Sequence, residues 1–338
     1  MKGVVFTGNR QLELREFPDP APGEDEVVIE IRASGMCGSD LHVYRTPDGS
    51  PFIAGHEPCG VVVERGSAVP ERMARRDSRV MVHHYDGCRC CPNCLSGWTQ
   101  LCDEGSVVYG RSGHGAHARY MKIPARTLVP LPDELSFVEG AAVSCGTGTA
   151  YGALRRMNMA GGGIVAVFGQ GPVGLSATMI AKAMGATVIA IDISPDRLAQ
   201  AKGFGANYLI NALTDEPVAA IKALTGGLGA EFVLECSGAS TACAAAARAT
   251  KTWGTCCFVG MGGELALNVR SDIIMRQLTL LGSWTFSNIG QKECADFAAR
   301  HRLPVERLFT HRFALGEAEA AYKLFDTQTT GKAVILPQ

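Results

Sequence analysis

The chain has 338 residues, enough for two domains of ordinary size, and its 46% hydrophobic and 19% charged residues are typical of a folded globular protein. A formal net charge of −1 argues against a broad electrostatic contact with nucleic acid or with an anionic membrane surface. No uninterrupted apolar run approaches the roughly 20 residues that a membrane-spanning helix needs.

The N-terminal segment and the cysteines indicate the compartment. The sequence MKGVVFTGNRQLELREF has one short apolar patch followed by charges, which is not the pattern of a signal peptide. Thirteen cysteines without an export signal predict a reducing environment, in which thiols bind metals or lie in cores instead of forming disulfides. We therefore expect a cytoplasmic protein.

Residues 1 to about 150 predict a β-rich domain. Short alternating strands such as 27–32 (VVIEIR) and 61–64 (VVVE) are separated by proline- and glycine-rich turns such as PDPAPGED, which favours an antiparallel, barrel-like domain. The same half contains the segment DGCRCCPNCLSGWTQLC, whose five cysteines are Cys88, Cys90, Cys91, Cys94 and Cys102. In a reducing compartment such clustered thiols indicate zinc or an iron–sulfur cluster.

From about Gly161 the pattern becomes strand, glycine turn, alanine-rich helix and strand. Near-continuous runs of Val, Ile and Leu that alternate with helices predict a parallel sheet covered on both faces, an α/β fold. The expected buried strands are IVAVF, TVIAID, NYLI, EFVLEC, TCCFVG and LTLLGS. The tail from about Asn288 predicts two helices (KECADFAARH and GEAEAAYKLFD) and a final strand-like segment, KAVIL.

A glycine motif in the second half has the context of a dinucleotide site. Gly169, Gly171 and Gly174 follow the predicted strand 164–168 and open a helix, and Asp192 ends the next strand. The first glycine makes the tight turn, the second lets the backbone approach a pyrophosphate, and the third allows close packing of helix and strand. The acid is expected to accept hydrogen bonds from the adenosine ribose. Glycines that only build a turn are the alternative.

Three further segments each supply one zinc ligand: GMCGSDLH with Cys37, GHEPCG with His56 and SCGTGTAYG with Cys145. A set of two thiolates and one imidazole leaves the fourth tetrahedral position open, which is typical of catalytic zinc. Each residue alone would more often be an ordinary buried side chain. Spacing alone does not select these three from thirteen cysteines and eight histidines.

With these residues the chain resembles the zinc-dependent medium-chain alcohol dehydrogenases over essentially its whole length. The stretch GHEPCGVVVERGSAV is similar to the zinc signature of that family, with matching residues Gly55, His56, Glu57, Gly60, Gly66 and Val69. The resemblance implies a GroES-like catalytic domain formed by 1–150 and 286–338, a Rossmann NAD-binding domain at 151–285, and an active site in the cleft between them. It also implies a homo-oligomer, a tetramer in preference to a dimer.

The resemblance further implies a structural zinc site in a lobe at residues 86–102. The four thiolates would come from Cys88, Cys91, Cys94 and Cys102, and Cys90 would be left over, because its neighbour Cys91 points to the metal. An iron–sulfur cluster on the same thiolates remains an alternative. A nucleic-acid-binding zinc ribbon is disfavoured, because the segment lacks basic and aromatic residues. Two zinc ions per chain are therefore expected.

Similarity to the family also assigns roles near the catalytic zinc. Ser39 would pass the proton of the substrate alcohol, through the nicotinamide ribose, to His42 at the surface. Turn formation is the alternative role for Ser39, and a plain solvent-facing side chain is the alternative for His42. Asp40 would accept the N–H of His56, and Glu57 would approach the metal as an alternate ligand.

The remaining roles come from the same resemblance. The expected NAD-binding residues are Thr149, Gly169, Gly171, Pro172, Val173, Gly174, Asp192 and Arg197, of which Thr149 and Val173 would contact the nicotinamide and Arg197 would flank the adenosine ribose. The substrate pocket would include His84, Tyr109 and Trp284, with ordinary packing as the alternative. The chain departs from the family in loops, where RRDSRV replaces a usual Gly-Asp-Arg-Val.

Together these observations predict a zinc- and NAD-dependent dehydrogenase acting on a small-molecule secondary alcohol or polyol and its ketone. A zinc-free quinone or enoyl reductase of the same fold is one alternative, but it would need none of the ligands Cys37, His56 and Cys145. A non-catalytic NAD-binding protein is another, but it would not need the proton path of Ser39 and His42.

Overall fold

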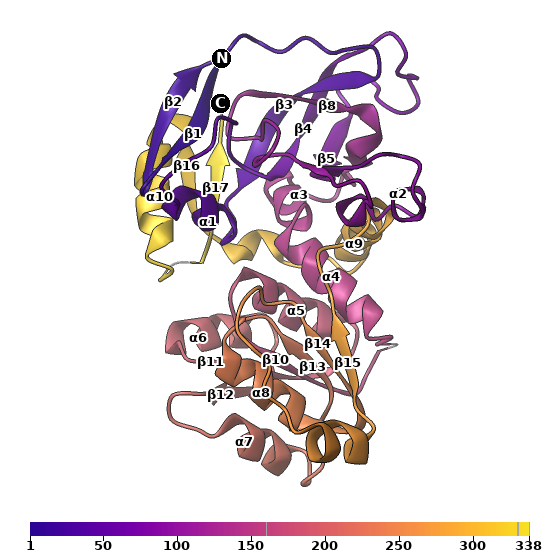
Figure 1. Ribbon diagram of the computed structural model, residues 1–338, viewed down its shortest axis with the longest axis vertical. Helices are drawn as coiled ribbons and strands as arrows, with labels where there is room; N and C mark the ends of the chain where they lie inside the picture. The colour runs from indigo at the N-terminus through magenta and orange to yellow at the C-terminus, as the bar shows by residue number, and fades with distance from the viewer. Residues whose placement is uncertain (160, 330, 338) are drawn as a thin grey trace. The chain divides into compact units, whose positions relative to one another are not determined.

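The computed structural model describes residues 1–159, 161–329 and 331–337. The chain divides into two compact units: the first combines Met1–Gly148 with Phe286–Gln338, and the second is the continuous stretch Thr149–Thr285. The first unit is therefore discontinuous in sequence, since its last part follows the whole of the second unit. Figure 1 shows the elements of both units coloured along the chain.

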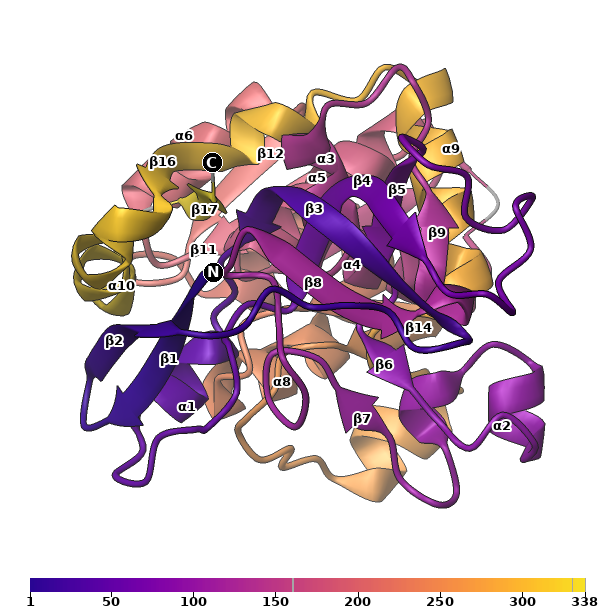
Figure 2. The same cartoon turned by 90° about the horizontal axis from the view of Figure 1, so that it is seen from above.

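A seven-stranded sheet forms the centre of the first unit, in the order β16-β17-β3-β4-β5-β9, with β8 paired to β3. Neighbouring strands are antiparallel, as the sequence predicts, except β16 and β17, which run parallel because a helical crossover joins them. Figure 2 shows β3, β4, β5 and β9 side by side. The strands are β3 (Glu26–Gly35), β4 (Glu57–Arg65), β5 (Arg79–Val82), β8 (Tyr120–Pro124), β9 (Leu128–Pro130), β16 (Phe309–Ala314) and β17 (Lys332–Leu336).

Shorter elements complete the first unit, and α4 (Gly146–Arg156) carries the chain from the first unit into the second. Two small antiparallel pairs are β1 (Lys2–Gly8) with β2 (Gln11–Glu16), and β6 (Tyr85–Asp86) with β7 (Val107–Val108). The other helices are α1 (Asp40–Arg45), α2 (Pro92–Leu95), α3 (Phe137–Val143), α9 (Asn288–Arg300) and α10 (Ala318–Asp326). Short helical turns are η1 (Thr99–Leu101), η2 (Ala125–Thr127), η5 (Val305–Leu308) and η6 (Leu315–Glu317).

Helix α10 shows how the C-terminal segment is fixed to the first unit. Its residues Ala318, Ala321, Tyr322 and Phe325 are buried at the i, i+3, i+4, i+7 spacing of an amphipathic helix. They pack in one apolar cluster with residues of β1 and β17 and with Met36. Met36 directly precedes Cys37 in the sequence. The burial of this stripe therefore brings the C-terminal helix next to a segment near the start of the chain.

The second unit contains the predicted parallel sheet. Six strands lie in the order β12-β11-β10-β13-β14-β15, and every neighbouring pair is parallel, which confirms the doubly wound Rossmann arrangement. In Figure 1, α5 and α6 cover one face of this sheet, and α7 and α8 cover the other. The elements are β10 (Ile164–Phe168), α5 (Pro172–Ala183), β11 (Thr187–Asp192), α6 (Pro195–Gly203), β12 (Tyr208–Asn211), α7 (Pro217–Leu224), β13 (Ala230–Glu235), α8 (Ser240–Ala249), β14 (Thr250–Phe258), η3 (Val269–Ile273), η4 (Ile274–Arg276) and β15 (Thr279–Gly282).

Two of the strands that were expected to be buried are the edges of this sheet. In β12, Tyr208 is 44% and Leu209 is 40% exposed, and both ends of β15 are exposed. An apolar run indicates a strand, but it does not distinguish a central strand from an edge strand, which has a neighbouring strand on one side only. Within the three described stretches of the chain, no helix is both long and apolar enough to cross a membrane.

Candidate active site

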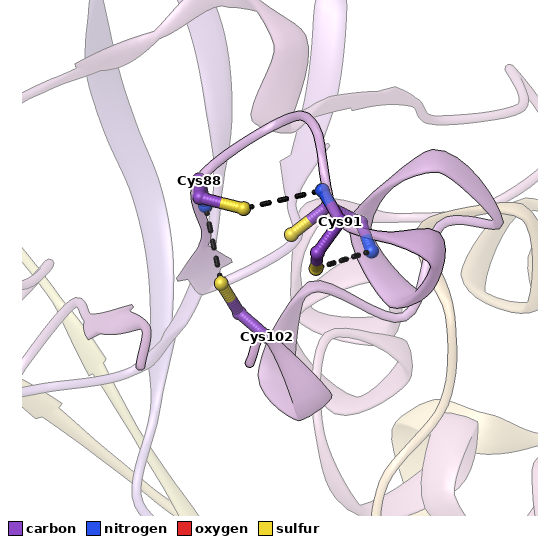
Figure 3. Close-up of side chains that lie close together, drawn as sticks. Cys88, Cys91 and Cys102 are labelled. Carbon is purple, nitrogen blue, oxygen red and sulfur yellow. Dashed lines mark hydrogen bonds between the residues drawn. The ribbon is translucent and has the colours of Figure 1, made fainter. Parts of the chain in front are cut away.

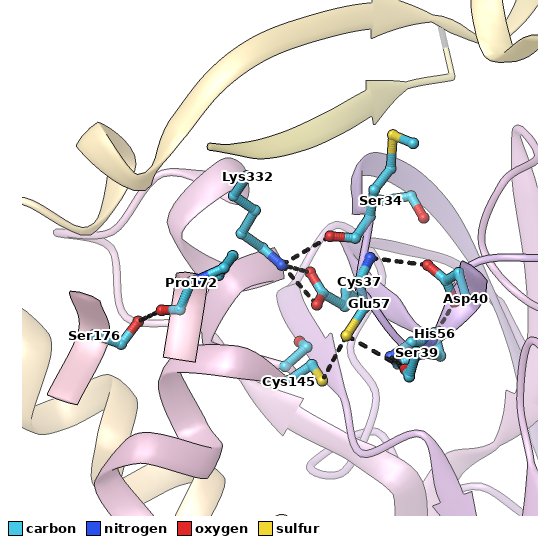
Figure 4. A network of polar contacts seen from close by, with 12 residues as sticks. Ser34, Cys37, Ser39, Asp40, His56, Glu57, Cys145, Pro172, Ser176 and Lys332 are labelled. Carbon is cyan, nitrogen blue, oxygen red and sulfur yellow. Dashed lines mark hydrogen bonds and ion pairs between the residues drawn. The ribbon is translucent and has the colours of Figure 1, made fainter. Parts of the chain in front are cut away.

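Three potential metal ligands meet at the ends of β3, β4 and α3 in the first unit. Cys37 follows β3, His56 precedes β4, and Cys145 follows α3, whose start is fixed by a capping box between Ser136 and Glu139. The Sγ atoms of Cys37 and Cys145 are 3.9 Å apart. Two thiolates on one tetrahedral zinc, with Zn–S bonds of about 2.3 Å, would be about 3.8 Å apart. The spacing of the two sulfurs therefore fits a zinc ion (Figure 4).

His56 is oriented by a buried carboxylate. Its Nδ1–H donates to Asp40 Oδ1 at 2.7 Å, and Asp40 Oδ2 accepts the backbone N–H of Cys37 at 2.9 Å. Burial raises the pKa of Asp40, but the charge and hydrogen bond of His56 outweigh burial and hold that pKa well below its ordinary value. When His56 binds a metal as the neutral imidazole, the hydrogen bond to Asp40 keeps its one proton on Nδ1 and leaves the lone pair of Nε2 to the ion.

Ser39 and His42 lie one helical turn apart at the start of α1, and they face different surroundings. The Oγ atom of Ser39 is 3.4 Å from Nε2 of His56 and donates to Cys37 Sγ, also at 3.4 Å. Its carbonyl oxygen accepts a hydrogen bond from Arg111 at 3.0 Å. His42 is exposed to solvent. This segment therefore presents a hydroxyl to the ligand cluster and an imidazole to water.

In the second unit, the glycine motif forms the turn between β10 and α5. Gly169 has a φ of +83°, in the region that favours glycine, and a Cβ on Gly174 would lie 1.8 Å from the Gly169 carbonyl oxygen. A Cβ on Gly171, by contrast, would meet nothing within 4 Å. Pro172 is the first residue of α5, and Val173 is half-buried beside it. The helix thus begins with an open backbone surface, as an anion site requires.

Asp192 ends β11 with its side chain 6% exposed. One of its carboxylate oxygens accepts the backbone N–H of Gln170 at 2.5 Å, and the other accepts that of Ser194 at 2.8 Å. These bonds hold the carboxylate beside the glycine turn. Arg197 is half-buried in the first turn of α6, and Thr149 is buried in α4.

The thiols of Cys88, Cys91, Cys94 and Cys102 form a second cluster, in which all four sulfurs lie within 4.8 Å of one another. Figure 3 shows three of these side chains converging, with sulfurs that accept backbone N–H groups at 3.2 to 3.5 Å. N–H donation from Cys90 and Cys91 lowers the pKa of Cys88 to about 6, while burial raises that of Cys94 to about 12. Four thiolates this close need a cation to ionise together, and a tetrahedral zinc would supply it.

Cys90 lies outside this set of four but not far from it. Its exposed thiol donates to Cys88 Sγ at 3.5 Å, and with Cys88 and Glu104 it forms a separate group of possible ligands. Cys90 thus remains outside the set of four, although the left-handed backbone at Arg89, with a φ of +73°, places its sulfur near that of Cys88.

Comparison with known proteins establishes the family to which the chain belongs. Residues 23–133 match the alcohol dehydrogenase GroES-like domain, and residues 172–300 match the zinc-binding dehydrogenase domain. The chain is 38% identical to the uncharacterised zinc-type alcohol dehydrogenase-like protein YphC of Escherichia coli (strain K12), over 99% of this chain and 98% of that protein. The chain belongs to the zinc-type medium-chain alcohol dehydrogenase family.

Two other relatives agree with this assignment. The sorbitol dehydrogenase of Bacillus subtilis (strain 168) is 31% identical over 95% of this chain and 92% of its own length. The structure of the alcohol dehydrogenase TADH from Thermus sp. ATN1 superposes with a TM-score of 0.91 and 28% identity, covering 100% of both chains. As a member of this family, the chain is an oxidoreductase, and its named relatives include alcohol and sorbitol dehydrogenases.

In this dehydrogenase, Glu57 lies beside the ligand cluster but is held by a lysine that the sequence analysis missed. Both residues are almost fully buried, and Lys332 Nζ lies 2.5 and 2.7 Å from the two oxygens of Glu57. Burial lowers the pKa of Lys332, but the charges of Glu57 and Cys37 raise it above its ordinary value. The available signal was a lysine at the head of the apolar strand KAVIL, where an unpaired charge would be unfavourable.

The three residues expected in the substrate pocket lie in different surroundings. The ring of His84 is 5.0 Å from that of His56, its Nδ1–H donates to the Ser144 carbonyl at 3.1 Å, and burial holds its pKa well below the ordinary value. Tyr109 packs against an apolar core of the first unit. Trp284 belongs to the second unit and is 46% exposed. Within the first unit, only His84 of these residues adjoins the metal ligands described above.

Proposed function

We propose that the chain is a zinc- and NAD-dependent dehydrogenase that oxidises a secondary alcohol or polyol to a ketone, and reduces the ketone in the reverse direction. The observation that carries this proposal is the cluster of Cys37, His56 and Cys145, whose ligand atoms lie within 4.8 Å of one another. A set of two thiolates and one imidazole has the composition of catalytic zinc sites that leave one position for substrate.

The two bound groups would supply the redox chemistry. Zinc supplies a Lewis acid for the alcohol oxygen, and NAD supplies the hydride acceptor. Cys37, His56 and Cys145 would hold the ion, and Asp40 keeps the proton on Nδ1 of His56, so that Nε2 can serve as the ligand. The glycine turn with Thr149, Val173, Asp192 and Arg197 would bind NAD. Cys88, Cys91, Cys94 and Cys102 would hold a second zinc, which is structural.

The side chains of α1 would move the proton. Ser39 would accept the proton of the substrate hydroxyl, because its Oγ lies 3.4 Å from Nε2 of His56, the atom that faces the metal position. Ser39 would pass the proton through the nicotinamide ribose to His42, which is exposed on the same helix and would release it to water. Glu57, paired with Lys332, would approach the ion while substrate and water exchange.

The substrate class rests on similarity and on the site. A relative named sorbitol dehydrogenase supports a polyol or another secondary alcohol. His84, buried and neutral beside His56, offers a polar edge on which such a substrate could be oriented, and Tyr109 and Trp284 are proposed as further pocket residues on the family resemblance alone. We also propose a cytoplasmic homotetramer, on the basis of the family resemblance.

Two measurements test the proposal. Elemental analysis of the purified protein should find about two zinc ions per chain, and a panel of primary alcohols, secondary alcohols and polyols should reveal NADH formation by absorbance. Oxidation is expected for secondary alcohols and polyols. If the protein binds one zinc per chain, or if none of these alcohols is oxidised by the zinc-loaded protein, the proposed function is wrong.

A further inference from the structure

A set of polar side chains buried in the first unit extends away from the metal ligands. Three of these side chains are 0% exposed: Ser34 on β3, Tyr322 on α10, and His117 in the loop before β8. Asp40 and His56 are 2% and 3% exposed. Together these five residues form what we term the Asp40 network. Polar groups so deeply buried are tolerated when they bond to one another, and removing one partner leaves another unsatisfied.

The network is continuous from Ser34 to the metal ligand. Ser34 Oγ is 2.7 Å from His117 Nδ1, and His117 Nε2 is 2.8 Å from the Tyr322 hydroxyl. That hydroxyl is 3.3 Å from Asp40 Oδ2, and Asp40 Oδ1 is 2.7 Å from His56 Nδ1. Four contacts thus join the five residues of the network. The first of them in the sequence, Ser34, and the last, Tyr322, are 288 positions apart.

The directions of these hydrogen bonds follow from the chemistry of the groups. An ionised carboxylate can only accept, so the Tyr322 hydroxyl donates to Asp40 and must itself accept from His117 Nε2–H. Burial lowers the pKa of His117 to about 4, so its ring is neutral and carries one proton. Nδ1 of His117 therefore accepts from Ser34. Every donor points toward the carboxylate, which in turn accepts the Nδ1–H of His56.

Local packing leaves a place for the His117 ring. Gly55, the residue before His56, has a φ of +90°, and a Cβ there would lie 2.4 Å from His117 Nδ1. The ring therefore occupies the space that any larger residue at position 55 would fill. Tyr322 is held in turn by the apolar stripe of α10, with Phe6 at 4.8 Å between ring centroids.

We propose that Tyr322 and His117 are positioning residues for the catalytic metal, because they fix the carboxylate of Asp40 and, through it, the orientation and tautomer of His56. The inference rests on the proposed function, since it assumes that His56 binds zinc. Without the Tyr322 hydroxyl, Asp40 Oδ2 would keep only the Cys37 N–H, and the His56 ring would be held less firmly.

The first test is the rate at which a chelator removes each zinc ion from Tyr322→Phe. The catalytic ion should leave about 10-fold faster than from the wild type, at the low end of the effect of residues that orient metal ligands, while the structural ion leaves at an unchanged rate. Tyr44→Phe is the matched control: its ring is 1% exposed and lies 5.4 Å from that of Tyr322, but its hydroxyl is outside the network. It should leave both rates unchanged.

A second test separates positioning from general loosening of the fold. In an Asp40→Asn background, Tyr322→Phe should add little further acceleration, because its effect passes through the carboxylate. His117→Gln, which keeps a donor toward Tyr322, should retain more catalytic zinc than His117→Leu. In the cobalt-substituted protein, Tyr322→Phe should change the visible absorption of the catalytic ion and not that of the structural ion.

The outcomes are distinguishable from those of the proposed function. A wild-type content of two zinc ions per chain supports the catalytic site independently of Tyr322. If zinc then leaves Tyr322→Phe at the wild-type rate, or if the full acceleration persists in Asp40→Asn, the positioning role is wrong while the zinc site stands. Equal acceleration for Tyr44→Phe would likewise assign the effect to packing and overturn the inference.

Discussion

At the scale of single residues, Ser39 and His42 combine two environments within one turn of α1. Ser39 lies 3.4 Å from both Cys37 Sγ and His56 Nε2, whereas His42 is exposed. A hydroxyl inside and an imidazole outside suit a path for a proton, since a buried site otherwise has no route to water. The backbone of one short helix fixes the separation of the two groups.

The first prediction concerns this path. Ser39→Ala should lower kcat for alcohol oxidation by about 100-fold or more, because it removes the acceptor next to the metal position. His42→Ala should have a smaller effect, greatest at low pH, and added buffer bases should partly restore its rate. Steady-state kinetics across pH and buffer concentration measure both. Rates equal to wild type, independent of buffer, would exclude these residues from the mechanism.

The second prediction concerns cofactor choice at Asp192. Its carboxylate is fixed by the N–H groups of Gln170 and Ser194, and a phosphate on the adenosine ribose of NADP would meet that negative charge. We expect NAD to be preferred by about 100-fold in kcat/KM, equivalent to roughly 3 kcal/mol. Asp192→Gly should weaken NAD and narrow or reverse the ratio, although Arg197 would offset some of the repulsion. Equal use of both cofactors by the wild type would contradict this prediction.

Of the residues around His56, the sequence predicts the metal ligands, but only the structure identifies the side chains that support them. Cys37, His56 and Cys145 could be predicted because they lie in segments that resemble a known family. Lys332 and Tyr322 could not, because each acts only through a partner almost 300 positions away, Glu57 or Asp40. In the sequence, Lys332 heads an ordinary strand, and Tyr322 is one more apolar residue of an amphipathic helix.

At the scale of elements, the lobe at residues 86–102 has little regular structure. It begins at the second residue of strand β6 and contains the four-residue helix α2 and the three-residue turn η1, and the side chains of α2 are not buried. Such a segment has no apolar core of its own, so the four thiols and a metal would supply the stabilisation. The family resemblance predicts the ligands of the lobe, but not the loop path between them.

The third prediction tests the lobe with two cysteines four residues apart. Cys94→Ser should release about one zinc ion per chain and lower the melting temperature, because three thiolates do not close the tetrahedron. Cys90→Ser is the matched control and should keep both ions, since Cys90 lies outside the set of four. Zinc content and thermal unfolding measure the result. Loss of zinc from Cys90→Ser, with retention in Cys94→Ser, would reverse the ligand assignment.

The fourth prediction uses two glycines at the start of α5 that have different surroundings. Gly174→Ala should destabilise the protein by about 1 to 3 kcal/mol, because its Cβ would lie 1.8 Å from the Gly169 carbonyl oxygen. Gly171→Ala should leave the stability of the NAD-free protein near wild type, because that Cβ meets nothing within 4 Å and the backbone is extended. It should nevertheless weaken NAD binding, because the open space is where a pyrophosphate would approach.

Denaturant unfolding without cofactor and titration with NADH, followed by fluorescence, separate the two variants. Unchanged NAD affinity in Gly171→Ala would show that the cofactor does not approach this turn. The comparison also marks what sequence patterns supply at this scale. The motif identifies three glycines by spacing, but only the structure shows that a side chain at Gly174 would meet the Gly169 carbonyl oxygen and that one at Gly171 would enter open space.

At the scale of the whole molecule, the two thiol-containing clusters proposed as zinc sites belong to the first unit. Every ligand of the two sets lies within Met1–Gly148, while the six-stranded sheet is contained in Thr149–Thr285. The second unit has its own apolar core, formed by residues of its strands and of α7 and α8. Metal binding and the stability of that sheet are therefore expected to be separable.

The fifth prediction follows from this separation. Removal of both zinc ions by a chelator should increase hydrogen exchange in the lobe and in the segments around Cys37 and Cys145, since each loses its cross-link. The amides of β10, β11 and β13 should stay protected. Hydrogen exchange with mass spectrometry measures each segment, and added zinc should restore the protection. Equal loss of protection in the parallel sheet would contradict the prediction.

The discontinuity of the first unit also sets an order in time during synthesis. When a ribosome has produced Cys37, Asp40, His56, Glu57 and Cys145, it has still to make the whole parallel sheet before α10 and β17 emerge. Until then the Asp40 carboxylate lacks the Tyr322 hydroxyl, and Glu57 lacks the Lys332 ammonium. The nascent ligand cluster is therefore incompletely supported for the time needed to add more than a hundred residues, whereas the parallel sheet can form from one continuous stretch as soon as it is released. The side chains that support the ligand cluster are therefore complete only when the C-terminal segment has been made, after all the ligands themselves.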